Sequence, residues 1–418
     1  MNSFFPRLVS WNVTSKCNLH CAHCYLDAGN STAKVGELST LESLDVIDQL
    51  ADFSPGAMIV FTGGEPLLRP DLFQLIAYAA ELGLLPVLGT NGLLLSPDRV
   101  AGLIESNLAG VGISLDSLDP DRHDDFRGLP GAWNQTIEGI ENAMTAGLAV
   151  QIHTTVTSGN YLEIDNLMDF AAEKGAVAFH LFFLVCTGRG QQISDITPAQ
   201  YEQALRSLVA AQEKYQGQML VRARCAPHFR RLAYVQNEML ARSSVGCMAG
   251  RSYLRITPQG RITPCPYLPD VAGDLRRNSL RQIWESALVF QLLRQPDLRG
   301  RCGACEFSEL CGGCRARAFA TNGDIMAEDP WCDFQPGTSR KFPKKLVTID
   351  EFQPQWTNEA RERLSRVPVA LRSMVEQSVE AYAQSIEEST ITVEILAAVR
   401  KKGMNRMTKS RIANRKRV

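Results

Sequence analysis

Three cysteines near the N-terminus, Cys17, Cys21 and Cys24, are separated by three and then two residues. Thiolates at this spacing can hold one face of an iron-sulfur cluster, but a four-iron cluster needs four ligands and this loop offers three. One iron is then left open, and an open coordination position at a catalytic metal can bind a small molecule directly. The spacing alone also allows a zinc site or an ordinary ferredoxin-type site.

The other cysteines divide unevenly along the chain. Of twelve cysteines in 418 residues, one stands alone at Cys186 and eight lie in the C-terminal half. Because no export signal is evident and the cytosol keeps thiols reduced, metal ligation is expected rather than disulfides. The count favours one three-cysteine cluster and two four-cysteine clusters built from Cys225, Cys247, Cys265, Cys302, Cys305, Cys311, Cys314 and Cys332.

Composition excludes several classes of partner. The formal net charge is −1 and 45% of the residues are hydrophobic, so nucleic acid is not an expected partner of this globular chain. No window approaches the roughly 18 apolar residues of a membrane span, and residues 1–11 do not form a signal peptide. We expect a cytoplasmic protein without membrane contact, ending in a basic disordered tail.

Short β-rich segments alternate with amphipathic helical patterns through the first 180 residues. The strands are expected at Ser10–Thr14, Met58–Phe61, Leu85–Gly89, Gly110–Leu115, Val150–Thr155 and Ala178–Val185. Helices are expected at Thr40–Asp52, Asp71–Leu82, Pro97–Ser106, Trp133–Ala146 and Glu163–Lys174. Six βα units predict parallel strands, either in a doubly wound sheet or in a partial (β/α)6 TIM-type barrel.

Polar and glycine residues at the ends of these strands favour the barrel, since a barrel builds its site there. The second strand runs into Gly63, Gly64, Glu65 and Pro66, where the glycines allow close backbone approach to a ligand and the carboxylate can accept from an ammonium group. Later strands lead to Asn91, Ser114, Asp116, Cys186 and Arg189. Asn91, Ser114 and Asp116 could contact a ligand or satisfy a local turn. Arg189 could pair with a substrate or cofactor carboxylate or be a solvated loop residue, and Cys186 could be a small buried hydrophobe or a hydrogen-atom donor. Asp124, Arg127 and Gly128 are interpreted as loop structure.

The CxxxCxxC loop followed by Gly-Gly-Glu-Pro resembles the radical S-adenosylmethionine enzymes. The resemblance implies that Cys17, Cys21 and Cys24 are catalytic ligands of a [4Fe-4S] cluster whose open iron binds S-adenosylmethionine. Its reductive cleavage would give a 5'-deoxyadenosyl radical that abstracts a hydrogen atom from a substrate. It further implies an electron donor such as ferredoxin or flavodoxin, and cofactor contacts at His23, Gly63, Gly64, Glu65, Pro66, Asn91, Ser114 and Asp116.

The second cysteine field resembles the SPASM auxiliary-cluster domain, with a hairpin expected over Tyr253–Thr257 and Arg261–Thr263. The resemblance implies two auxiliary iron-sulfur clusters of the [4Fe-4S] type. Cys225, Cys247, Cys265 and Cys314 would bind the one nearer the barrel, and Cys302, Cys305, Cys311 and Cys332 the distal one. Only Gly312 and Gly313 separate Cys311 from Cys314, where the family usually has three residues. A zinc knuckle of Cys302, Cys305, Cys311 and Cys314 is the alternative.

The C-terminal region has helical patterns at 356–368, 370–387 and 390–400. It resembles a small module on a subunit of the light-independent protochlorophyllide reductase, through Trp356-Thr357, Val367-Pro368, Arg372, Glu380, Ala383 and Ile391 to Glu394. The expected division is a core barrel at 1–195, a helical linker at 196–240, a cysteine-rich hairpin and loop domain at 241–340, the helical module at 341–402 and the tail at 403–418.

Three segments suggest a substrate. Trp11–Thr14, Phe183–Gly190 and Cys225–Pro227 look like segments of the enzymes that trim propionate or acetate side chains from sirohaem derivatives on the way to haem and haem d1. This resemblance implies an oxidoreductase or lyase of tetrapyrrole biosynthesis that removes a carboxylate-bearing group. One alternative is a SPASM-type maturase acting on a ribosomally made peptide. An alternative of another class is a non-catalytic iron-sulfur electron carrier or scaffold.

Overall fold

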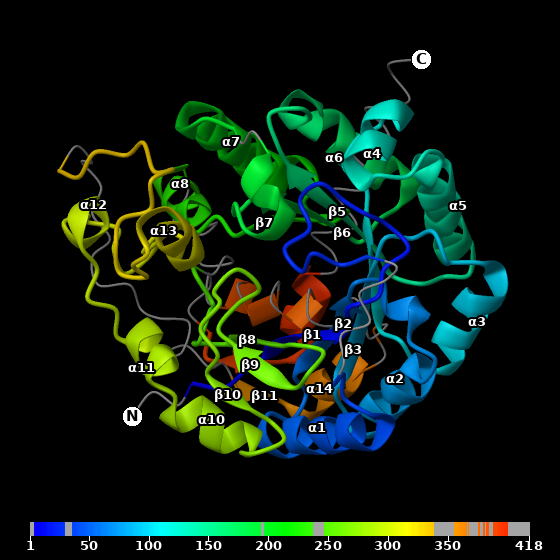
Figure 1. The fold of residues 1–418 in the computed structure, drawn as a ribbon. Helices are drawn as coiled ribbons and strands as arrows, with labels where there is room; N and C mark the ends of the chain where they lie inside the picture. The colour runs from blue at the N-terminus through cyan, green and yellow to red at the C-terminus, as the bar shows by residue number, and fades with distance from the viewer. Residues whose placement is uncertain are drawn as a thin grey trace.

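A computed structural model describes residues 4–29, 36–193, 196–236, 246–337, 355–365, 367, 375–376, 379–380, 382–383 and 388–399. Its main feature is a curved ten-stranded sheet of order β10-β9-β8-β1-β2-β3-β4-β5-β6-β7 (Figure 1). The parallel strands are β1 (Leu8–Thr14), β2 (Met58–Gly63), β3 (Leu85–Thr90), β4 (Gly110–Ser114), β5 (Val150–Val156), β6 (Ala178–Phe183), β7 (Leu220–Arg224) and β8 (Tyr253–Ile256).

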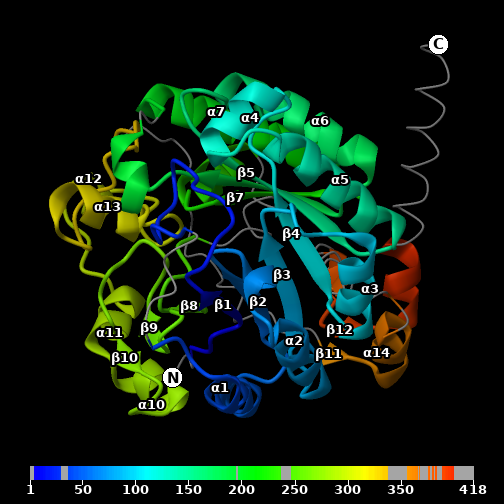
Figure 2. The same cartoon turned by 45° about the vertical axis from the view of Figure 1, so that its right-hand side comes forward.

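Helices cover the outer face of this sheet (Figures 1 and 2). They are α1 (Thr40–Phe53), α2 (Leu72–Glu81), α3 (Pro97–Glu105), α4 (Pro120–Arg127), α5 (Ala132–Thr145), α6 (Ile164–Lys174) and α7 (Pro198–Lys214). Side chains alternate along each strand, and the outward set, such as Trp11, Phe61 and Ile152, is fully buried in the apolar core. The inward set includes many small or polar residues, such as Ser10, Gly112 and His153.

The partial barrel expected from the first six βα units is confirmed, but its sheet contains more parallel strands than the six expected. The segment predicted as an all-helical linker contains β7 between α7 and α8 (His228–Gln236), so the helix prediction was wrong at Leu220–Arg224. This five-residue segment pairs in parallel with β6, and tertiary pairing outweighs the local helical pattern.

A helix also replaces a predicted loop after β4. Asp124 and Arg127 belong to α4, whose first turn is capped by the Asp119 side chain and whose end is Gly128 in a left-handed conformation with φ 70°. Both are ordinary helix boundary signals, and the loop prediction was therefore wrong.

The expected hairpin is confirmed as β8 and antiparallel β9 (Arg261–Thr263), followed by β10 (Gly273–Asp274). Unexpectedly, β8 also pairs in parallel with β1, so the cysteine-rich segment continues the barrel sheet. The remaining elements of this segment are α10 (Leu280–Ser286), α11 (Leu288–Arg294), α12 (Gly300–Gly303) and α13 (Arg315–Asn322).

The C-terminal module contains β11 (Gln355–Trp356), α14 (Asn358–Ser365) and β12 (Thr390–Ile391), with a further helix at 393–399. β11 and β12 pair in parallel, and Trp356 donates a 3.1 Å hydrogen bond to Glu380. The helix expected at 370–387 lies largely outside the described residues, as does the tail. No helix in the described ranges has the length and apolar character needed to cross a membrane.

Candidate functional site

The loop that carries the first three cysteines begins where β1 ends. Cys17 is buried, Cys21 and Cys24 are half-buried, and all three pack in a small apolar cluster with Leu19 and Ala132. The backbone N–H of Leu19 donates to the Cys17 sulfur at 3.4 Å. The sequence-predicted ligands of the first cluster are therefore brought together at the carboxyl end of the barrel, where barrel enzymes place their sites.

Burial strongly affects these thiols. It raises the pKa of Cys17 to about 12, and it also raises the pKa of Cys21. The Arg127 guanidinium, 3.8 Å from the Cys21 sulfur, acts in the opposite direction. Since the thiolate is the form that binds metals, Arg127 favours at Cys21 the form that a cluster needs.

Arg127 is held in place by a buried ion pair with Asp116. The Arg127 Nε donates to Asp116 Oδ2 at 2.7 Å, and the Thr155 backbone N–H donates to Oδ1 at 2.8 Å. Burial by itself would raise the pKa of Asp116, but Arg127 keeps it below its usual value. The predicted cofactor contact of Asp116 remains a prediction, whereas its contact with Arg127 was missed because the two residues are joined only by the tertiary fold.

The two glycines after β2 approach the protein's own backbone. The N–H of Gly64 donates to the Thr14 carbonyl at 2.8 Å, and that of Glu65 donates to the Lys16 carbonyl at 2.7 Å. A Cβ on Gly64 would lie 2.0 Å from the Lys16 oxygen, and Gly63 has φ 145°, which other residues rarely adopt. The glycines thus let this turn pack directly under the start of the cysteine loop.

The Glu65 carboxylate is fully buried and joins two loops. It accepts hydrogen bonds from the Leu67 N–H at 3.1 Å, the Thr90 hydroxyl at 2.8 Å and the Asn91 N–H at 3.0 Å. The Asn91 side chain in turn donates to Asn18 in the cysteine loop at 2.8 Å. Glu65 and Asn91, predicted as cofactor contacts, therefore also fix the cysteine loop against β2 and β3. Pro66 begins the 3-10 helix Pro66–Leu68 that follows Glu65.

His23 stacks face to face on Phe126, with ring centroids 4.4 Å apart and planes inclined by 3°. Burial lowers the pKa of His23 to about 4, so the ring is neutral near pH 7. A cavity of ≈ 300 Å³ adjoins this stack at the carboxyl ends of β4 and β5. It is lined by Asp116, Ser117, Arg122, Asp125, Phe126, Thr157, Gly159 and Asn160, most of which the sequence did not single out. Ser114 is half-buried at the end of β4.

Arg189, which follows β6, holds the cysteine loop from the far side of the barrel. Its Nε donates to the Cys21 carbonyl at 2.9 Å, and its Nη1 donates to the Asp27 carboxylate at 2.7 Å. The neighbouring Gly188 has φ 56°, and a Cβ there would lie 2.5 Å from the Cys24 carbonyl. Arg189 was predicted to pair with a substrate or cofactor carboxylate or to be solvated, and here it is a clamp on the loop.

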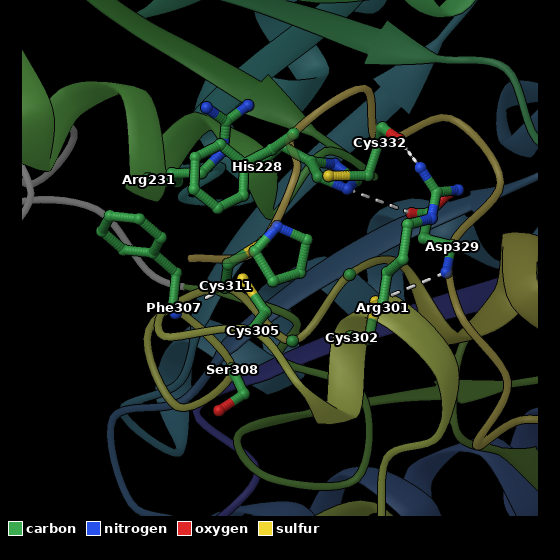
Figure 3. Close-up of a pocket in the computed structure, with 14 residues that line it drawn as sticks. His228, Arg231, Arg301, Cys302, Cys305, Phe307, Ser308, Cys311, Asp329 and Cys332 are labelled. Atoms are coloured by element: carbon green, nitrogen blue, oxygen red, sulfur yellow. Dashed lines mark hydrogen bonds and ion pairs between the residues drawn. The ribbon is translucent and has the colours of Figure 1, made fainter. Parts of the chain in front are cut away.

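The eight C-terminal cysteines fall into two groups of four. Cys225, Cys247, Cys265 and Cys314 pack in one apolar cluster, which we call the proximal group. Cys302, Cys305, Cys311 and Cys332 line one cavity, the distal group, whose members are labelled in Figure 3. These are the two sets implied by the SPASM resemblance. Cys314 packs with the proximal group, and both the two four-cysteine clusters and the zinc knuckle stay predictions.

The proximal group is defined by packing in one apolar cluster, and the distal group by the cavity that its members line. Among the described residues, no three His, Cys, Asp or Glu side chains are close enough to bind a single metal ion. Every described cysteine is free of disulfides, and Cys186 belongs to neither group.

A double-glycine turn separates Cys311 of the distal group from Cys314 of the proximal group. Gly312 and Gly313 have φ 64° and 67°, and a Cβ on Gly313 would lie 3.1 Å from the Cys302 sulfur. Only glycine adopts two successive left-handed conformations easily, and this accounts for the short spacing. Cys225 is also left-handed, with φ 58°, an unusual conformation for a side-chain-bearing residue that is typical of functional sites.

A buried carboxylate connects the two groups. Asp329 accepts from the Cys314 backbone N–H at 2.7 Å and from Arg317 at 3.0 Å, while its own N–H donates to the Cys302 sulfur at 3.4 Å. Arg317 also donates to the Cys225 carbonyl at 2.9 Å. His228 faces the same carboxylate (Figure 3), and its Nε2 lies 3.6 Å from Asp329 Oδ2. Burial alone would raise the pKa of Asp329, but Arg317 keeps it low.

Three family models match separate parts of the chain. The radical SAM superfamily matches residues 11–171, the SPASM iron-sulfur cluster-binding domain matches residues 247–306, and the proto-chlorophyllide reductase 57 kD subunit family matches residues 356–400. The barrel and the three-cysteine loop at its mouth therefore define an enzyme of the radical S-adenosylmethionine type. This sets aside the alternative of a non-catalytic carrier, and the matches indicate iron-sulfur clusters and S-adenosylmethionine binding.

Comparison with individual relatives shows which members of this superfamily the chain is similar to. It is 40% identical to the AdoMet-dependent heme synthase of Methanosarcina barkeri over 344 residues, which is 79% of this chain and 97% of the relative. It is 30% identical to the pre-heme d1 synthase of Dinoroseobacter shibae, covering 78% and 85% of the two chains, and 31% identical to the mycofactocin maturase MftC of Mycobacterium tuberculosis, covering 78% and 83%. The chain belongs to the radical S-adenosylmethionine superfamily, and the predicted classification with the haem and haem d1 enzymes is confirmed.

Solved structures agree on the fold. Streptococcus suis SuiB bound to S-adenosylmethionine matches with a TM-score of 0.66 at 19% identity, covering 79% of this chain and 78% of that one. Native anSMEcpe with bound AdoMet matches with a TM-score of 0.60 at 18% identity, covering 78% and 93%.

Proposed function

We propose that this enzyme abstracts a hydrogen atom from a tetrapyrrole side chain, with loss of a carboxylate-bearing group. The observation that carries the proposal is the 40% identity over nearly the whole length of a relative named AdoMet-dependent heme synthase. The oxidoreductase or lyase chemistry predicted from the sequence is consistent with this likeness.

The buried thiols fit the cofactors that the family implies. Cys17, Cys21 and Cys24 would hold a site-differentiated [4Fe-4S] cluster, because this loop provides three clustered sulfurs and a nearby guanidinium. When bound, the cluster and S-adenosylmethionine supply the one-electron chemistry that removes hydrogen from an unactivated carbon. The cavity beside Asp116 and Phe126, at the strand ends, would receive part of S-adenosylmethionine.

The chain's own residues keep the loop rigid. Glu65 and Asn91 fix it to two strand ends, Arg189 holds its carbonyls, and Arg127 places positive charge against Cys21. Preorganised contacts of this kind avoid reorganisation when the reaction occurs.

We infer that the proximal and distal groups each bind a [4Fe-4S] cluster. Fully ligated clusters relay electrons or accept one from a substrate radical, which suits a net oxidation with S-adenosylmethionine as co-substrate. We further propose a ferredoxin or flavodoxin as electron donor. We also propose that the chain is divided into the barrel, the linker, the cysteine-rich domain and the helical module predicted from the sequence, with β7 assigned to the barrel sheet.

A second candidate function is peptide maturation, because the mycofactocin maturase is 31% identical over 83% of its length. The test uses anaerobically reconstituted protein with dithionite and S-adenosylmethionine, to which an iron porphyrin with propionate side chains or a candidate peptide is added. We expect 5'-deoxyadenosine to rise with the porphyrin, together with a product whose mass has fallen by the carboxylate-bearing group. A rise with the peptide alone would contradict the tetrapyrrole proposal and support the second candidate.

A further inference from the structure

The inner face of the barrel sheet is basic. Side chains at Trp11, Ile152 and Val221 point outward into the core, so the intervening residues point inward. The strands β1 to β8 contain no Asp or Glu at any position, yet their inner face carries His153, His180, Arg222, Arg224 and Arg255. This face therefore carries three guanidinium groups, and none of the residues in its own strands is a carboxylate.

Two of the inner-facing cations lie on β7 beside two histidines. His153, His180 and Arg222 are register partners on β5, β6 and β7, and the two imidazole rings stack at 4.9 Å. Gly112 on β4 makes room for this stack, because a Cβ there would lie 2.2 Å from the His153 ring. Burial lowers the pKa of His153 to about 3, so its ring is neutral at pH 7 and offers a flat, uncharged surface next to the guanidinium groups.

Arg224 has an unusual partner for a half-buried arginine. Its Nε donates to His180 Nδ1 at 3.1 Å, and no carboxylate within the described residues lies at ion-pair distance from it. Burial lowers the pKa of His180 as well, so that partner is a neutral acceptor. A guanidinium does not lose its charge in proteins, and a cation removed from water without a counter-charge is costly.

The arginines that fix loops in this protein differ from this pattern. Arg127 pairs with Asp116, and Arg317 pairs with Asp329. On the inner face, Arg255 resembles Arg224, since it donates to the neutral amide of Asn12. Arg224 and Arg255 thus have neutral partners, unlike Arg127 and Arg317, and a neutral partner leaves the charge of the guanidinium group available to an anionic ligand.

The basic inner face lies close in sequence or in space to both the three-cysteine loop and the proximal group. Arg224 directly precedes Cys225 of the proximal group, and Arg255 lies over the ring of Tyr25, which directly follows Cys24, at 5.4 Å. A ligand held on this face would therefore contact strands that lead to the three-cysteine loop and to the proximal group.

We propose that Arg224 binds a carboxylate of the substrate on the inner face of β7, with Arg222 and Arg255 adding to the positive field. The inference rests on the proposed function, since it takes the substrate to be a tetrapyrrole with several carboxylate side chains. The bound carboxylate would be one that the reaction leaves in place, and it would orient the macrocycle through the planar fork of the guanidinium group.

The test is a binding titration of the anaerobically reconstituted full chain with iron coproporphyrin III, followed by porphyrin absorbance. The tetramethyl ester of the same porphyrin, which keeps the macrocycle and loses the charges, is titrated in parallel. The variants are Arg224→Gln, the double variant Arg222→Gln/Arg224→Gln, and Arg224→Lys. Arg281→Gln on the outer helix α10, whose side chain is 53% exposed, is the matched loss of one positive charge.

We expect wild type to bind the acid more tightly than the ester. Arg224→Gln should weaken binding of the acid by about tenfold or more, because charge-assisted hydrogen bonds are the stronger ones and glutamine leaves the carboxylate without a counter-charge. The double variant should weaken it further, and the lysine variant should recover part of the loss. Ester binding, S-adenosylmethionine binding and the Arg281→Gln titration should match wild type, and unchanged cluster absorbance verifies that each variant is folded and loaded.

Other outcomes distinguish failure of the carboxylate site from failure of the proposed function. If wild type binds the acid and Arg224→Gln binds it equally well, the carboxylate site is refuted while the tetrapyrrole substrate stands. If wild type binds neither porphyrin, both are refuted. Weaker S-adenosylmethionine binding in Arg224→Gln, with porphyrin binding unchanged, would instead assign the arginine to the methionyl carboxylate and overturn the proposal.

Discussion

Asp329 accepts a 2.7 Å hydrogen bond from the backbone N–H of Cys314. Through its own N–H it also contacts the sulfur of Cys302, so one buried residue touches a member of the proximal group and a member of the distal group. Its charge is balanced by Arg317, whose side chain is 3% exposed. The two groups therefore share an electrostatic environment, and a change at Asp329 should be felt at both.

Asp329→Asn should destabilise the protein and raise the reduction potentials of both auxiliary clusters. The amide still accepts from Cys314, but Arg317 is left as a buried charge without its partner, which costs about 3 to 5 kcal/mol. Loss of a nearby negative charge favours the reduced cluster. Denaturant unfolding and potentiometry monitored by electron paramagnetic resonance measure the two effects. Asp324→Asn, which removes the partner of the exposed Arg299, is the control and should change neither. Unchanged potentials in Asp329→Asn would contradict the shared environment.

Iron content should follow the three groups of cysteines. Wild type, after anaerobic reconstitution, should hold about twelve irons if each group binds a four-iron cluster. Cys17→Ala should retain about eight and lose 5'-deoxyadenosine formation, whereas Cys302→Ala should also retain about eight but keep some uncoupled cleavage. Iron analysis and chromatography of the nucleoside give the answer. A wild-type plateau near four irons with bound zinc would refute the auxiliary clusters.

Gly64→Ala should disturb the cysteine loop although it changes no side-chain chemistry. The new Cβ would lie 2.0 Å from the Lys16 carbonyl, so the turn or the loop must move, and overpacking of this kind costs about 1 to 3 kcal/mol. We expect weaker S-adenosylmethionine binding by equilibrium dialysis and a lower melting temperature. Gly102→Ala in α3 meets only the Phe73 ring at 3.6 Å or more and serves as control. Normal S-adenosylmethionine binding in Gly64→Ala would show that the close approach is not required.

Arg127→Met should cost more stability than Arg127→Lys. Methionine leaves the Asp116 carboxylate buried without a charge partner, at a cost of about 3 to 5 kcal/mol, while lysine keeps the charge and loses the two-pronged contact. Because Arg127 also approaches the Cys21 sulfur, iron should bind the first site more weakly in Arg127→Met. Urea unfolding and iron binding at limiting iron test this. Equal stabilities of the two variants would argue against the ion pair as the reason for burying Arg127.

Much of this architecture is predictable from local patterns. The first six βα units follow hydrophobic periodicity, and the assignment of eight cysteines to two sets follows their spacing through a family resemblance. β7 and the pairing of β8 with β1 are not predictable in this way. β7 has five residues, and Ser10 pairs with Arg255 across 245 positions of sequence, so neither leaves a local signal.

The site residues show a similar limit. A polar side chain after a barrel strand can be located from sequence, but whether it faces a ligand or a neighbouring loop depends on how the loops pack. Glu65 and Arg189 both have partners within the protein, and Arg127 was dismissed as loop although it lies beside Cys21. These contacts join residues 106 or 168 positions apart, or depend on backbone donors that sequence does not display.

The clamp formed by Arg189 also bears on the order of events during synthesis. Cys21 leaves the ribosome 168 residues before the side chain that holds its carbonyl, so the nascent loop must wait for the sixth barrel strand before it takes its final shape. At about 5 to 20 residues per second, that interval lasts on the order of ten seconds or more. During that interval the loop lacks its contact with Arg189, so we expect the three thiols to reach their final arrangement only after the sixth barrel strand has been made.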